Sequence, residues 1–192
     1  MPADYRSIDD PYCYAGTAVL KNIPGLRTAA TLAEFEAISV AQRSSEPLPR
    51  GRFSVTHYRA VHRHLFGDVY RWAGTYRRTR ISKGHSMFCY PENIDREMRH
   101  LFGWLGTKRC LRDLTLDEFL VGSAFFLAEL NAIHPFREGN GRTQLVFATL
   151  LSVQAGHPFH LWRLRPRKFL AAMIESFRGD QAALQTELRR LV

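Results

Sequence analysis

Residues 134–142 read HPFREGNGR and bring together side chains that could do chemistry on a phosphate. His134 can act as a base near neutral pH. Glu138 is an oxygen ligand of the kind that Mg²⁺ prefers. Arg142 can hold a phosphate through two parallel hydrogen bonds. A base, a metal ligand and a phosphate donor within nine residues predict a site for a phosphate-bearing substrate.

The position of this stretch strengthens that interpretation. An apolar helix is predicted before it, and Pro135 disfavours helical geometry at the preceding residue, so this helix should end at Ile133. The next helix should start near Gly141, which places GNG at a helix N-terminus, where unpaired N–H groups and the helix dipole favour anions. Gly139 and Gly141 allow the backbone to approach an oxygen closely. Composition alone also allows a capped interhelical loop with a hydrogen-bonded histidine, but the combination favours a catalytic loop.

The surrounding chain is predicted to be mostly helical. Apolar residues at helical spacing indicate helices over residues 31–42, 54–70, 91–105, 115–133, 141–156, 167–177 and 180–192. Capping boxes are predicted from Thr31 with Glu34 and from Thr115 with Glu118. The helix over 115–133 is apolar nearly all round and should be the central buried one. Alternating residues in the range 75–90 predict a small β-hairpin. The expected fold is all-α, a single domain over residues 1–192 with this hairpin attached.

Length and composition set the outer limits. The chain has 192 residues, of which 45% are hydrophobic and 23% charged, as in a folded soluble protein. No apolar stretch reaches bilayer length, and the polar, acidic N-terminus is unlike a signal peptide. Cys13, Cys89 and Cys110 are scattered without paired spacing. They fit a reducing cytoplasm better than a disulfide framework or a zinc site.

The net charge of +9 comes mainly from arginine, with 23 arginines and four lysines. The basic residues spread along the chain, apart from RRTR at 77–80 and RLRPRK at 163–168. We interpret most of them as a solvated surface. The alternative interpretation is that these basic residues create a positive electrostatic potential that attracts polyanions. Because no zinc finger, basic zipper or RNA-binding signature accompanies the charge, nucleic acid is the least favoured partner.

Taken as a whole, the stretch 134–142 resembles the signature HPFx(D/E)GNGR of the Fic family, and every fixed position is matched. The resemblance extends to DDPYCYAGTAVLKN at 9–22, LFGDVYRWAG at 65–74 and ISKGHSMFCYPENI at 81–94. It therefore covers nearly the whole chain. The sequence is similar to short bacterial Fic proteins of the toxin type, whose relatives transfer AMP from ATP to a protein hydroxyl. The fold implied is the Fic-type helical bundle, with the hairpin as a flap.

The resemblance also implies a role for each residue of the loop. His134 would deprotonate a tyrosine, threonine or serine hydroxyl of a target protein, and Glu138 would hold Mg²⁺ against the phosphates of ATP. Attack at the α-phosphorus would release pyrophosphate. The expected ATP-binding residues are Lys83, Gly84, Arg137, Gly139, Asn140, Gly141 and Arg142.

In the family the flap adds a segment of the target as an extra strand. The expected target-binding residues are Ile81, Ser82, His85, Ser86, Met87 and Phe88. The inhibitory pattern (S/T)xxxE(G/N) of the family does not occur in this sequence, the nearest approach being Ser176 to Asp180. The resemblance therefore implies a separate small antitoxin protein that supplies this helix.

The family implies a cytoplasmic toxin that acts on DNA gyrase and topoisomerase IV. Two alternatives stay open: a host-directed effector, secreted into a host cell, that modifies small GTPases, and a Doc-like kinase. The kinase is disfavoured because Doc toxins carry a lysine in place of Gly141. One departure concerns ATP: the family usually continues GNGRxxR, whereas here the sequence is GNGRTQL, with Leu145 in the place of the second arginine.

Overall fold

The computed structural model describes residues 10–83 and 86–192, and most of this chain is helical, which confirms the predicted all-α class. The α-helices are α1 (Ala29–Ser45), α2 (Val55–Phe66), α3 (Ile94–Thr107), α4 (Leu116–Ile133), α5 (Asn140–Ala155), α6 (Pro166–Ser176) and α7 (Ala182–Leu191). Single 3₁₀ turns occur at Pro91–Asn93, Arg109–Leu111 and Leu161–Arg163.

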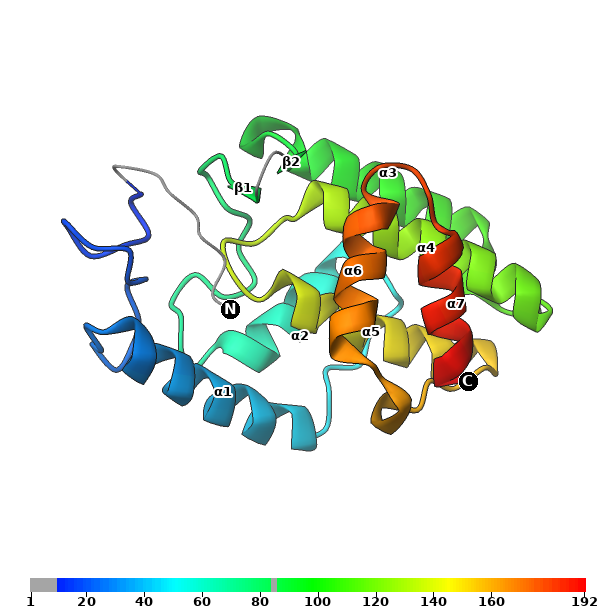
Figure 1. The fold of residues 1–192 in the computed structure, drawn as a ribbon, viewed down its shortest axis with the longest axis horizontal. Coiled ribbons are helices and arrows are strands. Elements are labelled where there is room, and N and C mark those ends of the chain that lie inside the picture. Colours follow the sequence, from blue (N-terminus) through cyan, green and yellow to red (C-terminus); the bar gives the residue numbers. More distant parts are fainter. Residues whose placement is uncertain (1–9, 84–85) are drawn as a thin grey trace.

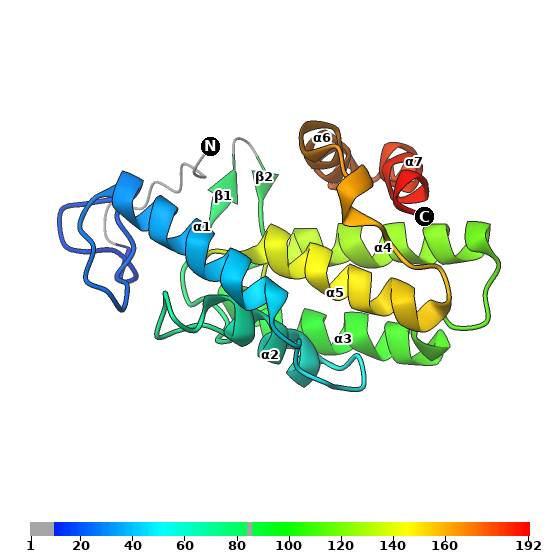
Figure 2. The ribbon, with the colours of Figure 1, turned by 90° about the horizontal axis from the view of Figure 1, so that it is seen from below.

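Helix α4 is the centre of the bundle, as its apolar sequence predicts. It contacts α3, α5, α6 and α7, and Figure 2 shows α4 and α5 side by side between the pair α6 and α7 and the pair α2 and α3. Helix α1 packs on α2 at the side of the bundle (Figure 1). The loop between α4 and α5 therefore joins the two central helices of the bundle.

The helix ends follow local capping chemistry, with one correction. Thr115 and Glu118 form the predicted capping box of α4. Gly156, which has a φ of 84°, caps the end of α5 directly after Ala155. The first helix begins earlier than predicted, however. Thr28 is its N-cap and accepts a hydrogen bond from the Thr31 N–H at 3.2 Å. The predicted capping box at Thr31 is wrong, because Thr31 already lies within the helix.

The hairpin is much shorter than the predicted range of 75–90. Strands β1 (Ser82–Lys83) and β2 (Ser86–Met87) pair in antiparallel fashion. Ser82 lies opposite Met87, and Lys83 lies opposite Ser86. Gly84 and His85, which were expected to contact ATP and the target, lie outside the described residues.

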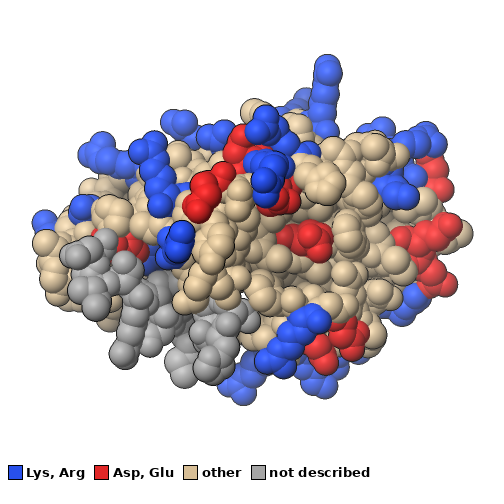
Figure 3. Space-filling model, turned by 90° about the horizontal axis from the view of Figure 1, so that it is seen from above, with Lys and Arg blue, Asp and Glu red and all other residues tan. Residues whose placement is uncertain are grey.

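No helix in the described part of the chain combines the length and apolarity needed to cross a membrane. Figure 3 shows lysine and arginine side chains spread around one face, with acidic side chains among them. On this face the positive charge is dispersed instead of forming one continuous patch.

Candidate active site

The stretch 134–142 connects α4 to α5, and the side chain of Asn140 closes it on itself. Asn140 Oδ1 accepts a hydrogen bond from the Phe136 N–H at 2.9 Å, and Nδ2 donates to the Phe136 carbonyl at 2.8 Å. The Phe136 ring is fully buried against Tyr58 and His62. Because both ends of the amide are engaged, Asn140 fixes the loop, and its backbone N–H is the group that can contact a ligand.

The first turn of α5 presents open backbone N–H groups. Gly139 precedes the helix with a φ of +81°, and a Cβ there would lie 2.4 Å from the Phe66 ring, so only glycine fits. The Thr143 N–H donates to the Gly139 carbonyl, but the N–H groups of residues 140–142 have no partner among the described residues. A Cβ at Gly141 would meet no atom within 4 Å. Anionic oxygens bind at such helix starts.

His134 lies directly after α4, in a left-handed conformation with φ 47° and ψ 62°. Its Nδ1 is 3.3 Å from the Asn131 carbonyl oxygen. A carbonyl can only accept, so Nδ1 carries the proton and the lone pair of the neutral ring lies on Nε2. The ring stacks on Phe88, with centroids 3.9 Å apart. This geometry prepares Nε2 to act as a base.

Glu138 is held by one carboxylate oxygen. Oε1 accepts a hydrogen bond from the Gly139 N–H at 2.9 Å and lies 3.5 Å from Nη2 of Arg142. Oε2 has no hydrogen-bond or ion-pair partner among the described residues. Burial raises the pKa of this carboxyl, and the nearby Glu36 carboxylate adds to the effect.

The donor set at Glu138 fits Mg²⁺. No group of three or more His, Cys, Asp or Glu side chains in the described chain could form an all-protein metal cage. Mg²⁺ does not need such a cage, because it is usually held by one or two carboxylates together with substrate phosphates and water. Glu138, beside the open N–H groups of α5, offers this arrangement.

Arg142 is half-exposed at the first turn of α5, and a helix outside the loop contacts it. Its Nη2 is 2.5 Å from Oε1 of Glu36 on α1. The guanidinium also lies over the Phe66 ring, 4.7 Å from the centroid. The sequence motif gave no indication of Glu36, since 106 positions separate it from Arg142.

Comparison with known proteins agrees with this geometry. The sequence profile of the Fic/DOC family matches residues 52–152, more than half of the chain. The probable protein adenylyltransferase y4lH of Sinorhizobium fredii is 49% identical over 189 residues, which are 98% of each chain. The chain belongs to the Fic/DOC family.

Two further comparisons place this Fic protein among its relatives. The protein adenylyltransferase VbhT of Bartonella schoenbuchensis is 35% identical over 97% of this chain, which corresponds to 40% of VbhT. The crystal structure of the effector protein BepC of Bartonella tribocorum, with bound AMPPNP, superimposes with a TM-score of 0.86 and 25% identity. That match covers 97% of this chain and 98% of the BepC chain.

The backbone of residues 134–142, which we call the Fic loop, is held by Arg77, a residue that the sequence analysis did not predict to belong to the site. The Arg77 side chain donates to the carbonyls of Thr79, Cys89, Ile133 and His134. It is 1% exposed, although it belongs to the RRTR cluster that we interpreted as surface. A guanidinium at the C-terminal carbonyls of α4 also opposes the negative end of the helix dipole.

His62 holds the other half of the Fic loop from α2. Its Nδ1 accepts a hydrogen bond from the Gly74 N–H at 2.9 Å, so Nε2 must carry the proton that is donated to the Glu138 carbonyl at 3.0 Å. Burial lowers the pKa of His62 to about 3. The ring is therefore neutral at physiological pH and serves as a structural support.

The expected role of Arg137 in ATP binding stays a prediction, and the structure shows a second role for this side chain. Its guanidinium pairs with Asp10 at 2.7 Å, and both side chains are 3% exposed. The buried ion pair joins the loop to the N-terminal segment, so Arg137 also holds the loop in place. Leu145, which replaces the second arginine of the family motif, is half-buried. It is not among the hydrophobic side chains packed against the core.

The flap reaches the loop through Phe88. The Phe88 N–H donates to the Ile81 carbonyl at 3.3 Å, and both side chains are buried. Ser82 is exposed, and Met87 is 53% exposed. A cavity of about 550 Å³ lies beside Met87 and Phe88, between α3 and α4. The structure thus brings Phe88 to the base His134 and leaves Met87 accessible.

Proposed function

We propose that this Fic protein is a protein adenylyltransferase that moves AMP from ATP to a hydroxyl of a target protein. The observation that carries the proposal is one short loop that holds three complementary features. These are a base with its lone pair on Nε2 of His134, a Glu138 carboxylate whose Oε2 has no partner among the described residues, and the N–H groups of residues 140–142, which likewise have no partner there. The names of the relatives support the same reaction.

In the proposed reaction, Nε2 of His134 takes the proton from a tyrosine, threonine or serine hydroxyl. The resulting oxygen attacks the α-phosphorus of ATP, and the bond to the β-phosphate oxygen breaks. Pyrophosphate leaves, and His134 later passes its proton to water. The N–H groups of residues 140–142 and the Arg142 guanidinium stabilise the negative charge on the phosphates.

Mg²⁺, held by Glu138 and the phosphates, would neutralise part of that charge when bound. The AMPPNP-bound BepC structure supports ATP as the nucleotide.

The flap is the proposed contact with the target protein. A segment of the target can pair with the edge of this short hairpin as an added strand, with Ser82 and the accessible Met87 beside it. The cavity next to Met87 and Phe88 is large enough for a target side chain. Phe88 itself is buried against His134, so we assign it to positioning the base instead of to direct binding.

We further propose that the protein is the toxin of a toxin–antitoxin pair, with the ATPase subunits of DNA gyrase and topoisomerase IV as targets. The absence of the pattern (S/T)xxxE(G/N) from the sequence supports a separate antitoxin. The likeness to the Bartonella effector BepC makes host proteins such as small GTPases the second candidate class of target.

The decisive experiment determines which phosphate group of ATP is transferred to the target protein. The protein is incubated with purified gyrase, topoisomerase IV or a small GTPase, once with α-³²P-ATP and once with γ-³²P-ATP. We expect label on a target only from α-³²P-ATP, and a loss of about 10²–10⁴-fold in His134→Ala, because a positioned base is removed. Label from γ-³²P-ATP would make the protein a kinase. Full activity of His134→Ala would exclude His134 as the base.

A further inference from the structure

Helix α1 contributes a carboxylate to the guanidinium of the Fic loop. Glu36 Oε1 lies 2.5 Å from Nη2 of Arg142, and the Glu36 side chain is 11% exposed while that of Arg142 is 39% exposed. Glu138 Oε1 is further from the same nitrogen, at 3.5 Å. Glu36 precedes the residues matched by the Fic/DOC profile, 52–152. It is therefore a contact of the loop that lies outside the matched family region.

The Glu36 carboxylate is itself fixed by a second donor. The Tyr70 hydroxyl donates to its other oxygen, Oε2. Burial and the neighbouring Glu36 raise the pKa of Tyr70, so the hydroxyl keeps its proton and stays a donor. The Tyr70 ring is buried and stacks on Trp72, with centroids 4.4 Å apart. Each oxygen of the Glu36 carboxylate thus accepts a hydrogen bond from a different donor, which leaves the carboxylate little freedom to rotate.

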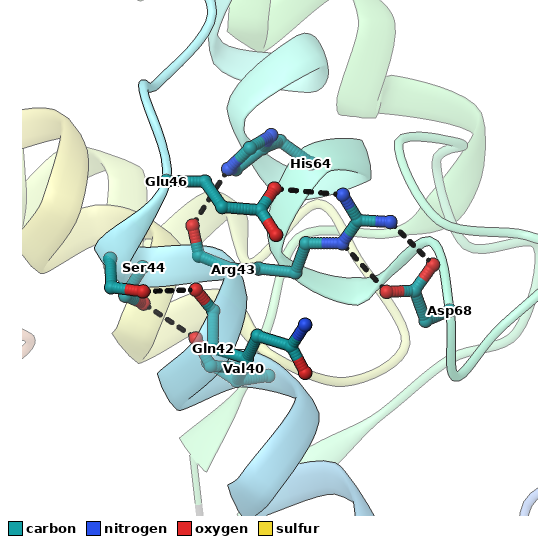
Figure 4. A network of polar contacts seen from close by, with 8 residues as sticks. Val40, Gln42, Arg43, Ser44, Glu46, His64 and Asp68 are labelled. Atoms are coloured by element: carbon teal, nitrogen blue, oxygen red, sulfur yellow. Dashed lines mark hydrogen bonds and ion pairs between the residues drawn. The ribbon is translucent and has the colours of Figure 1, made fainter.

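Helix α1 is anchored so that Glu36 keeps this position. Arg43, seven positions further along α1, lies with its guanidinium between Glu46 and Asp68, as Figure 4 shows. Its Nε is 2.6 Å from Asp68 Oδ2, just after α2. His64 on α2 lies 2.8 Å from the Arg43 carbonyl, for which it must be the donor. These contacts tie the end of α1 to α2.

Glu36 leaves much of the Arg142 guanidinium available. It engages only Nη2, whereas Nε and Nη1 have no partner among the described residues. Phe66 covers one face of the group. A guanidinium that is held at one nitrogen and along one face has little freedom to rotate. Arg142 also lies in the first turn of α5, whose N–H groups at residues 140–142 have no partner among the described residues. Such preorganisation lowers the entropy lost when a phosphate binds.

We propose that Glu36 is a positioning residue for nucleotide binding, which orients Arg142 so that its remaining donors face a phosphate of ATP. The inference rests on the proposed function only in taking ATP as the ligand. Glu36 could instead compete with phosphate for Arg142. In that case the carboxylate would weaken nucleotide binding, and its removal would tighten nucleotide binding.

The test measures equilibrium binding of a non-hydrolysable ATP analogue with Mg²⁺ by calorimetry, without any target protein. We expect Glu36→Gln to weaken binding about tenfold, because a charge-assisted contact becomes a neutral one. Glu34→Gln, an exposed change on the same helix, is the matched control and should leave binding unchanged. Tyr70→Phe, which removes only the hydroxyl, should weaken binding less and in the same direction.

A double-mutant cycle separates positioning from general damage to the fold. If Glu36 acts through Arg142, Glu36→Gln should have no further effect on binding in an Arg142→Ala background. An equal loss in both backgrounds, unchanged binding in Glu36→Gln, or tighter binding in that variant would overturn the inference. Because no AMP transfer is measured, a protein that binds the analogue but modifies no target would refute the proposed function and leave this inference intact.

Discussion

Acid should destabilise this protein through His62, and the size of the effect can be worked out from the structure. The ring accepts a hydrogen bond from the Gly74 N–H and donates to the Glu138 carbonyl, which only the neutral form can do. Its pKa in the folded protein is about 3, against an ordinary value of 6.5. As the pH falls below 6.5, His62 becomes protonated in the unfolded chain but stays neutral in the folded protein.

The stability that His62 supplies is therefore complete above its unfolded pKa and is lost as the pH falls from 6.5 toward 3. Each pH unit in this window changes the free energy of unfolding by up to about 1.4 kcal/mol. Between pH 7 and pH 5 the loss from this one group should be about 2 kcal/mol.

Urea denaturation at the two pH values measures this loss directly. In His62→Gln the titrating ring is absent, so the drop in stability between pH 7 and pH 5 should shrink by about 2 kcal/mol, whatever the absolute stability of the variant. His100→Gln, a change at an exposed histidine, should keep the drop seen in the wild type. Equal drops in the wild type and His62→Gln would refute the assignment of a neutral, buried His62.

Two further changes test the loop. Glu138→Gln should abolish Mg²⁺-dependent nucleotide binding. It should also raise the melting temperature at neutral pH, because the raised pKa of Glu138 means that folding disfavours its charge. A fall in the melting temperature would contradict this. Leu145→Arg should fold, since Leu145 is half-buried and outside the core, and should lower the KM for ATP about tenfold through a charge-assisted phosphate contact. Unchanged KM in a variant that melts normally would show that this position no longer contacts the nucleotide.

The parts of the fold that could be predicted depend on neighbours in the sequence. Pro135 ends α4 at Ile133, and the Thr115 capping box starts it, because both effects act within one helical turn. The composition of residues 134–142 likewise indicated a base, a metal ligand and a helix start. Even locally, Thr28 took the capping role expected of Thr31, since a threonine only caps the helix that begins directly after it.

The parts that could not be predicted are contacts between distant positions. His62 and Glu138 are 76 positions apart, Arg77 and His134 are 57 apart, and Glu36 and Arg142 are 106 apart. No periodicity or spacing links such pairs in a single sequence. Arg77 illustrates the problem, because a cluster such as RRTR is usually solvated, and only the fold shows that one of its arginines is buried.

These distant contacts share a physical role at the loop. Arg77 binds the His134 carbonyl, His62 binds the Glu138 carbonyl, and Asn140 binds both backbone groups of Phe136. Each of these supports binds a backbone group of the loop and does not itself engage the His134 ring or the Glu138 carboxylate. Buried polar supports are stable only when all their partners are in place, so the loop is ordered only while the surrounding helices are packed. The geometry for phosphate chemistry is thus a property of the whole bundle, although nine consecutive residues supply the reacting groups.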